Sequence, residues 1–215
     1  MRKKIIALVA LGMLGTAVSV LAQGQLNYSI RVTGSIVAHV YGYVPGEDFK
    51  SGNTASETPA GSQTYMGSPL QGSGFSAQLF AANGASQPEG SLTAVAGSLT
   101  PFRTGATLGG TIATSTLTVP QVPVGGTGTF QLRVWDNLGG TLTSWAQAEP
   151  LWLNGTIAAG KSILYNVAAL NVNADSPPNM LGFRSFNIQG GIPEPSTFLL
   201  GGLGAAAWLI LRHRK

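Results

Sequence analysis

The segment at residues 155–162, GTIAAGKS, has the spacing of a phosphate-binding loop. It matches the pattern G-x-x-x-x-G-K-[ST], in which backbone N–H groups and the lysine bind phosphates. Such a loop must follow a buried parallel strand and open a helix. Residues 151–153 and 162–170 are weak candidates for that strand and helix, but no alternating series of strands and helices surrounds them. We therefore interpret Asn154-Gly155 and Gly160-Lys161 as two turns that precede a strand.

Few side chains are available for proton transfer. His39 is the only histidine within residues 23–191, and we interpret it as a strand residue because no partner pattern accompanies it. Glycosidases need two carboxylates across a cleft, whereas Glu47 and Asp48 are adjacent on the chain. Asp136-Asn137 is typical of a turn, and less so of a calcium ligand pair. We expect no enzyme activity, no cofactor and no metal site; only a cleft that unites distant acids such as Glu47 and Asp136 would favour a hydrolase.

Aromatic side chains offer one route to ligand binding. Trp135, Trp145 and Trp152 could form an exposed platform for stacking sugar rings, as in a carbohydrate-binding module. A small β domain also needs large apolar side chains in its core. We favour core tryptophans and keep carbohydrate contact as the alternative.

The composition excludes several classes of protein. Charged residues make up 9% of the chain, far below the roughly 25% of typical soluble domains. Residues 23–191 carry six basic and seven acidic side chains, a net charge of −1, so nothing supports nucleic acid binding. The absence of cysteine excludes disulfides, thiolate zinc sites and a cysteine nucleophile.

Alternation of apolar and polar residues predicts short strands through the middle of the chain. Within residues 129–135, for example, Phe130, Leu132 and Val134 share one face, opposite Gln131, Arg133 and Trp135. The predicted strands are 25–32, 35–41, 74–80, 111–119, 129–135, 162–167 and 183–188. Frequent turn signals between them predict an all-β fold, a single β-sandwich of Greek-key or jelly-roll type over residues 23–189. Residues 45–69, rich in Gly, Ser, Thr and Pro, are expected to form a long exposed loop, and no long amphipathic helix is expected outside the two ends.

Residues 1–22 have the features of a secretory signal peptide. Arg2, Lys3 and Lys4 form its basic start, and an apolar stretch follows at residues 5–20. The small residue Ala22 and the moderate Val20 two positions before it predict cleavage after Ala22 by signal peptidase.

The C-terminal end predicts a short transmembrane helix. Residues 197–211 contain no charge, yet a helix of that length spans about 22 Å, less than the hydrocarbon core of about 30 Å. Extending the helix backward would bury Glu194 at a cost of roughly 2.5–3.5 kcal/mol near the bilayer centre. Arg212, Arg214 and Lys215 orient the tail with its end in the cytoplasm. The helix is therefore short for a permanent anchor and suits a transient one.

This C-terminal arrangement resembles a known sorting signal. Pro193, Glu194 and Pro195, followed by a Gly-rich apolar segment and a basic end, are similar to the PEP-CTERM signal of exported bacterial proteins. The resemblance implies that residues 190–215 are recognised and removed by exosortase, a membrane-embedded protease-transpeptidase. The three motif residues are then acted upon by another enzyme and catalyse nothing themselves.

Together these features predict an exported protein of the cell surface or extracellular matrix. The resemblance implies that it resides in the inner membrane only transiently. We expect a structural or adhesive role in association with exopolysaccharide, with a carbohydrate-binding module as the alternative.

Overall fold

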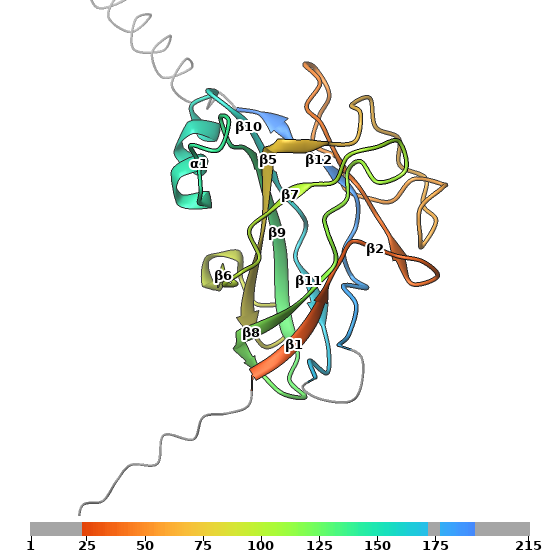
Figure 1. Cartoon of the computed structure of the whole chain (residues 1–215), viewed down its shortest axis with the longest axis vertical. Helices are drawn as coiled ribbons and strands as arrows, with labels where there is room; N and C mark the ends of the chain where they lie inside the picture. The colour runs from red at the N-terminus through yellow and green to blue at the C-terminus, as the bar shows by residue number, and fades with distance from the viewer. Residues whose placement is uncertain (1–22, 172–176, 192–215) are drawn as a thin grey trace, which may run out of the picture.

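The computed structural model describes residues 23–171 and 177–191, which form a mostly β domain (Figure 1). The coarse prediction of an all-β fold is therefore confirmed. One short α-helix and one 3₁₀ turn accompany the strands. The elements are β1 (Gln23–Tyr28), β2 (Arg31–Val32), β3 (Ile36–Val37), β4 (Val40–Tyr41), β5 (Gly72–Asn83), η1 (Glu89–Ser91), β6 (Thr93–Ala94), β7 (Thr100–Phe102), β8 (Ser115–Pro123), β9 (Gly128–Asp136), α1 (Trp145–Leu153), β10 (Ala158–Lys161), β11 (Tyr165–Val167), β12 (Phe186–Asn187) and β13 (Gln189–Gly190).

A seven-stranded antiparallel sheet organises the domain. Its main path runs β13-β10-β9-β5-β6, while β11 also pairs with β9 and β7 also pairs with β5. The long central strands β5 and β9 are in register from Phe75 opposite Asp136 to Asn83 opposite Gly128. Smaller two-stranded pairs form between β1 and β8, β4 and β12, and β2 and β3. The Greek-key or jelly-roll arrangement stays a prediction.

The two faces of β9 lie in different cores, whereas its alternation predicted a half-buried strand with a single buried face. Phe130, Leu132 and Val134 belong to the main core, which also contains apolar side chains of β1 and β8. Trp135 lies on the opposite face and belongs to a second, smaller core. Because both faces are covered, every residue of β9 except Asp136 is buried.

The second core is closed by α1, a helix that the sequence analysis did not predict. α1 has nine residues, includes Pro150, and buries Trp145, Ala148 and Trp152 against β9 and β10. Such a short helix gives too few turns for a recognisable apolar period. It includes residues 151–153, considered above as a strand.

The loop at residues 45–69 differs from its prediction. It is irregular, as expected, but Glu47, Asn53 and Glu57 are buried within it. The prediction of an exposed loop is therefore wrong at these positions. Polar side chains enter the interior here because each finds hydrogen-bond partners.

Candidate functional site

Three tryptophans form a continuous edge-to-face stack between the sheet and α1. The ring centroids of Trp135 and Trp145 lie 6.0 Å apart at 68°, and those of Trp145 and Trp152 lie 5.7 Å apart at 61°. All three side chains are buried, because α1 folds back over β9 and covers Trp135. The alternative interpretation, an exposed platform for stacking sugar rings, is therefore wrong. The favoured interpretation as core tryptophans is confirmed.

A hollow of about 340 Å³ opens beside this stack. Its volume falls within the range of small-molecule sites, roughly 300–1,000 Å³. The walls combine apolar and polar groups from separate parts of the chain: Phe49, Glu89, Gln131, Trp152, Lys161 and Ile163. Trp152 is thus the one predicted carbohydrate-contact residue that borders this hollow, whereas Trp135 and Trp145 do not line it.

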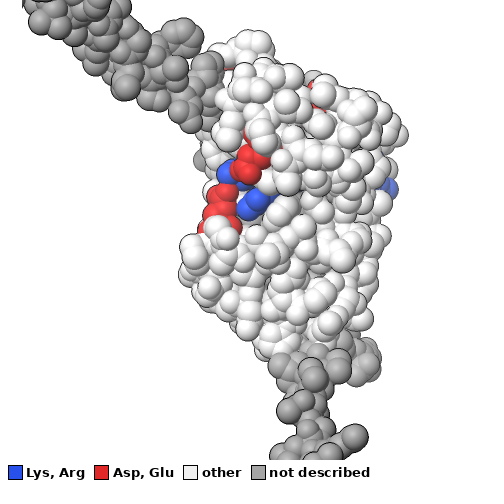
Figure 2. Space-filling view, turned by 90° about the vertical axis from the view of Figure 1, so that its left-hand side faces the viewer, with Lys and Arg blue, Asp and Glu red and all other residues white. Residues whose placement is uncertain are grey.

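Charged side chains gather at this hollow. Lys161 Nζ lies 2.6 Å from Glu89 Oε1 and 3.7 Å from a carboxylate oxygen of Glu149, and Arg133 lies 3.9 Å from Glu89. Gln131 Nε2 donates a hydrogen bond of 3.2 Å to the other Glu89 oxygen. Figure 2 shows a compact group of acidic and basic side chains on the face that carries α1, on a surface that is otherwise mostly uncharged.

These contacts set the ionisation of Glu89. Burial by itself raises the pKa of Glu89, but hydrogen bonds from Lys161 and Gln131 and the nearby positive charges outweigh burial. The pKa of Glu89 therefore lies below its ordinary value, and the carboxylate is ionised at neutral pH. The hollow thus offers an aromatic edge, an ammonium group and a carboxylate within one small site.

Replacing Lys161 with methionine should raise the pKa of Glu89 with little loss of stability. The substitution removes the closest cation from Glu89 and keeps most of the apolar stem. Because both side chains are partly exposed, the ion pair stabilises the fold by less than about 1 kcal/mol. NMR titration of the Glu89 carboxyl carbon and urea unfolding measure the two effects. An unchanged Glu89 pKa would contradict the assigned contact.

Part of the phosphate-loop pattern, residues 158–161, lies in an antiparallel strand. Gly160 and Lys161 pair with Val134 and Arg133 as part of β10, which follows a helix and leads to further strands. The rejection of a phosphate loop agrees with this geometry, but the prediction of a turn at Gly160-Lys161 is wrong. Glycine fits at position 160 of this strand because the backbone of Ile188 lies so close that a Cβ would be only 3.1 Å from it.

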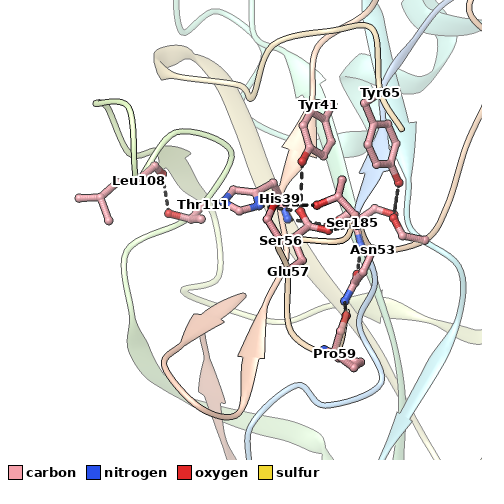
Figure 3. Close-up of polar contacts among 12 residues, drawn as sticks. His39, Tyr41, Asn53, Ser56, Glu57, Pro59, Tyr65, Leu108, Thr111 and Ser185 are labelled. Atoms are coloured by element: carbon pink, nitrogen blue, oxygen red, sulfur yellow. Dashed lines mark hydrogen bonds and ion pairs between the residues drawn. The ribbon is translucent and has the colours of Figure 1, made fainter. Parts of the chain in front are cut away.

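A second polar cluster surrounds His39 (Figure 3). His39 Nδ1 lies 2.6 Å from Glu57 Oε1, and the Tyr41 hydroxyl donates to the same oxygen at 3.1 Å. The backbone N–H of Thr54 donates to Glu57 Oε2 at 2.6 Å. The partner of His39 was not predictable from the sequence, because Glu57 lies 18 residues away in an irregular loop.

The same cluster secures the irregular loop to the strands. Tyr41 and Tyr65 stack with ring centroids 4.0 Å apart, and the Tyr65 hydroxyl donates to the carbonyls of Gly52 and Ser185. Burial by itself raises the pKa of Glu57, but its hydrogen bonds outweigh burial and hold the pKa below the ordinary value. Glu57 is therefore an ionised, buried carboxylate whose described contacts join the loop to β4 and its neighbours.

The remaining candidate acids occupy separate places. Asp136 Oδ1 accepts a hydrogen bond from the Leu138 N–H, so the predicted turn at Asp136-Asn137 is confirmed. Glu47 is buried beside Lys50 and accepts the Met66 N–H. Within residues 23–171 and 177–191, no group of three His, Asp or Glu side chains is placed to hold a metal ion.

The sorting residues lie outside the described residues. These are Pro193, Glu194 and Pro195 of the predicted motif and Arg212, Arg214 and Lys215 of the basic end; the predicted signal peptide at residues 1–22 lies outside as well. In the part of the chain that the structure describes, no helix has the length and apolar character needed to cross a membrane.

Comparison with known proteins identifies the end of the chain. The family model of the PEP-CTERM protein-sorting motif matches residues 191–215. The chain carries a PEP-CTERM sorting signal. This result confirms the resemblance drawn from the sequence and supports an exported protein that exosortase sorts through a C-terminal membrane-anchoring signal. No curated protein and no solved structure matches the chain.

The PEP-CTERM match begins directly where the folded domain ends. Gly190, which the sequence analysis assigned to the sorting signal, pairs with Ala158 as the last residue of β13. Gly191 packs against Gly155 and the Trp152 carbonyl, so close that a Cβ would clash with both. The sorting signal is therefore joined to the edge of the central sheet beside α1.

Proposed function

We propose that this protein is a non-enzymatic component of the cell surface or extracellular matrix with a structural or adhesive role. The PEP-CTERM sorting signal carries the proposal, because it commits the chain to export and to exosortase. The low charge of the domain suits a protein that packs among neutral matrix polymers. We further propose that its partner there is exopolysaccharide.

The sorting step is tested by replacing Pro193 and Pro195 with alanine in the native host. The two prolines hold the chain extended and remove two backbone donors, and proteases generally bind extended substrates. The variant should keep its tail and stay with the inner membrane, while the wild type loses the tail and reaches the surface or matrix. Intact mass and cell fractionation measure both outcomes. A wild-type chain that keeps its tail in cells with exosortase would disprove the sorting proposal.

A carbohydrate-binding module is the second candidate, and the hollow beside Trp152 favours it. Phe49 is 47% exposed there, next to the hydrogen-bonding groups of Glu89, Gln131 and Lys161. An apolar ring beside such groups is a combination that binds sugars.

Phe49→Ala tests this site without disturbing the tryptophan core. Retention of the purified protein on the host's exopolysaccharide should fall at least about tenfold, equivalent to about 1.4 kcal/mol. Leu181→Ala is the matched control, because Leu181 is 58% exposed but does not line the hollow. Equal retention of both variants and the wild type would remove this candidate and leave a role that does not depend on this hollow.

A further inference from the structure

The point at which the chain leaves the domain is held firmly. β13 pairs with β10 through Gln189 and Gly190, and Trp152 Nε1 donates a hydrogen bond of 3.1 Å to the Gln189 carbonyl. The Tyr43 ring covers Gly190, where a Cβ would lie 2.6 Å from the ring. Gly191 then packs on Gly155. The domain therefore offers no flexible spacer before residue 192.

Four large apolar side chains are exposed around this exit: Tyr43, Phe49, Leu153 and Ile163, which we call the exit face. Their exposed fractions lie between 43% and 48%. Tyr43 contacts Gly190, and Phe49 and Ile163 line the hollow together with Gln189. Leu153 ends α1, two residues before the glycine that contacts Gly191. They come from three separate parts of the chain and lie beside residues 189–191 or beside the residues that contact them.

The length of chain beyond the exit limits how far this face can stand from a membrane. Six residue steps separate Gly191 from Thr197, the first residue of the uncharged segment. At roughly 3.3–3.6 Å per residue, even a fully extended chain spans only about 20 Å. The headgroup region of one leaflet takes up about 5–8 Å of that distance. The exit face must therefore lie close to the lipid headgroups as long as the tail is anchored.

We propose that the exit face rests on the outer surface of the lipid bilayer until the sorting signal is removed. Aromatic and aliphatic side chains at this level enter the boundary between headgroups and acyl chains, as interfacial segments do. Nearby Lys161 is already paired with Glu89, so contact depends on apolar burial and not on attraction to anionic lipid. The inference rests on the sorting signal and does not require the polysaccharide partner.

The lack of cysteine permits a direct test on residues 23–215, the chain that remains after the signal peptide is removed. Single-cysteine variants Leu153→Cys and Ile163→Cys report the exit face, and Leu181→Cys and Val124→Cys are matched exposed controls. Val124 directly follows β8, whose end pairs with the start of β1 at the opposite end of the domain from α1 (Figure 1). Each variant carries a fluorophore and is reconstituted into phosphatidylethanolamine–phosphatidylglycerol vesicles that contain a lipid with a nitroxide on its headgroup.

Fluorescence at positions 153 and 163 should be quenched at least about twofold more than at positions 124 and 181, since interfacial side chains enter the boundary by about 5–10 Å. The difference should persist in high salt and disappear when the tail is cut off by an engineered protease site. Equal quenching at all four positions would overturn the proposal, as would quenching that arises only when exosortase is added, which would make the enzyme the partner. Vesicle flotation verifies anchoring separately, and circular dichroism verifies the fold of each variant.

Discussion

Replacing Trp135 with alanine should lower the free energy of unfolding by about 3–5 kcal/mol, the range for buried aromatic truncations. Trp135 is fully buried, contacts the Trp145 ring edge-to-face, and donates a hydrogen bond of 3.0 Å to the Leu142 carbonyl. Its removal leaves a cavity under α1 that a nine-residue helix cannot close without losing its own packing. Urea unfolding of the mature chain measures the loss, and Tm should fall by roughly 6–20 °C.

Leu138→Ala provides the control for Trp135→Ala. Leu138 lies three residues further along the chain but is 46% exposed, so its truncation should change stability by less than about 0.5 kcal/mol. If the two variants unfold at the same urea concentration, the second core contributes little, and the assignment of the tryptophan stack as a structural core is wrong.

Glu57→Gln should destabilise the protein by about 3 kcal/mol at neutral pH. The ionised carboxylate accepts hydrogen bonds from the His39 Nδ1–H, the Tyr41 hydroxyl and the Thr54 N–H. An amide has only one oxygen, so with its oxygen on His39 and Tyr41 its NH₂ group faces the Thr54 N–H. In the other orientation the NH₂ group faces His39 and Tyr41, and His39 Nδ1 must give up its proton to accept. Because the Glu57 side chain is only 1% exposed, water cannot replace the lost partner.

The pH dependence of stability identifies the charge of Glu57 as the cause. A carboxyl with a lowered folded-state pKa contributes stability that is present above its unfolded-state pKa, ordinarily about 4.3. That contribution disappears as pH falls through the folded-state pKa. Wild-type stability should therefore decline more steeply than that of Glu57→Gln on acidification below about pH 4.3. Parallel curves for wild type and Glu57→Gln would refute the prediction.

The strands of the domain were predictable where a face alternates over many residues. The segment 129–135 corresponds to β9, and Phe130, Leu132 and Val134 share the main core as the alternation indicates. The burial of the opposite face, which includes Trp135, was not predictable because α1 covers it. Boundaries were less predictable: the pattern over 111–119 begins four residues before β8, which starts at Ser115. Short bridging strands such as β6 and β13 have two residues each, too few for any period to emerge.

The candidate sites depended on contacts that no local pattern encodes. Glu89 and Lys161 are 72 residues apart, yet they form the shortest ion pair at the hollow. Exposure of the tryptophans was misjudged for the same reason, since α1 covers Trp135 only after the chain has turned back over β9. The scarcity of charge was the one usable signal, because each acid of a nearly uncharged domain needs a partner if it enters the interior.

The sequence alone identified the PEP-CTERM sorting signal, because such a signal is one contiguous segment of the chain. It also determined the β character of the domain, since alternation acts between residues two positions apart. Only the tertiary structure decided which side chains meet. It joined His39 to Glu57, placed three tryptophans beneath α1, and brought four exposed apolar residues to the chain exit. Those contacts arise where segments that are distant in the chain pack together, and this packing depends on the whole sheet.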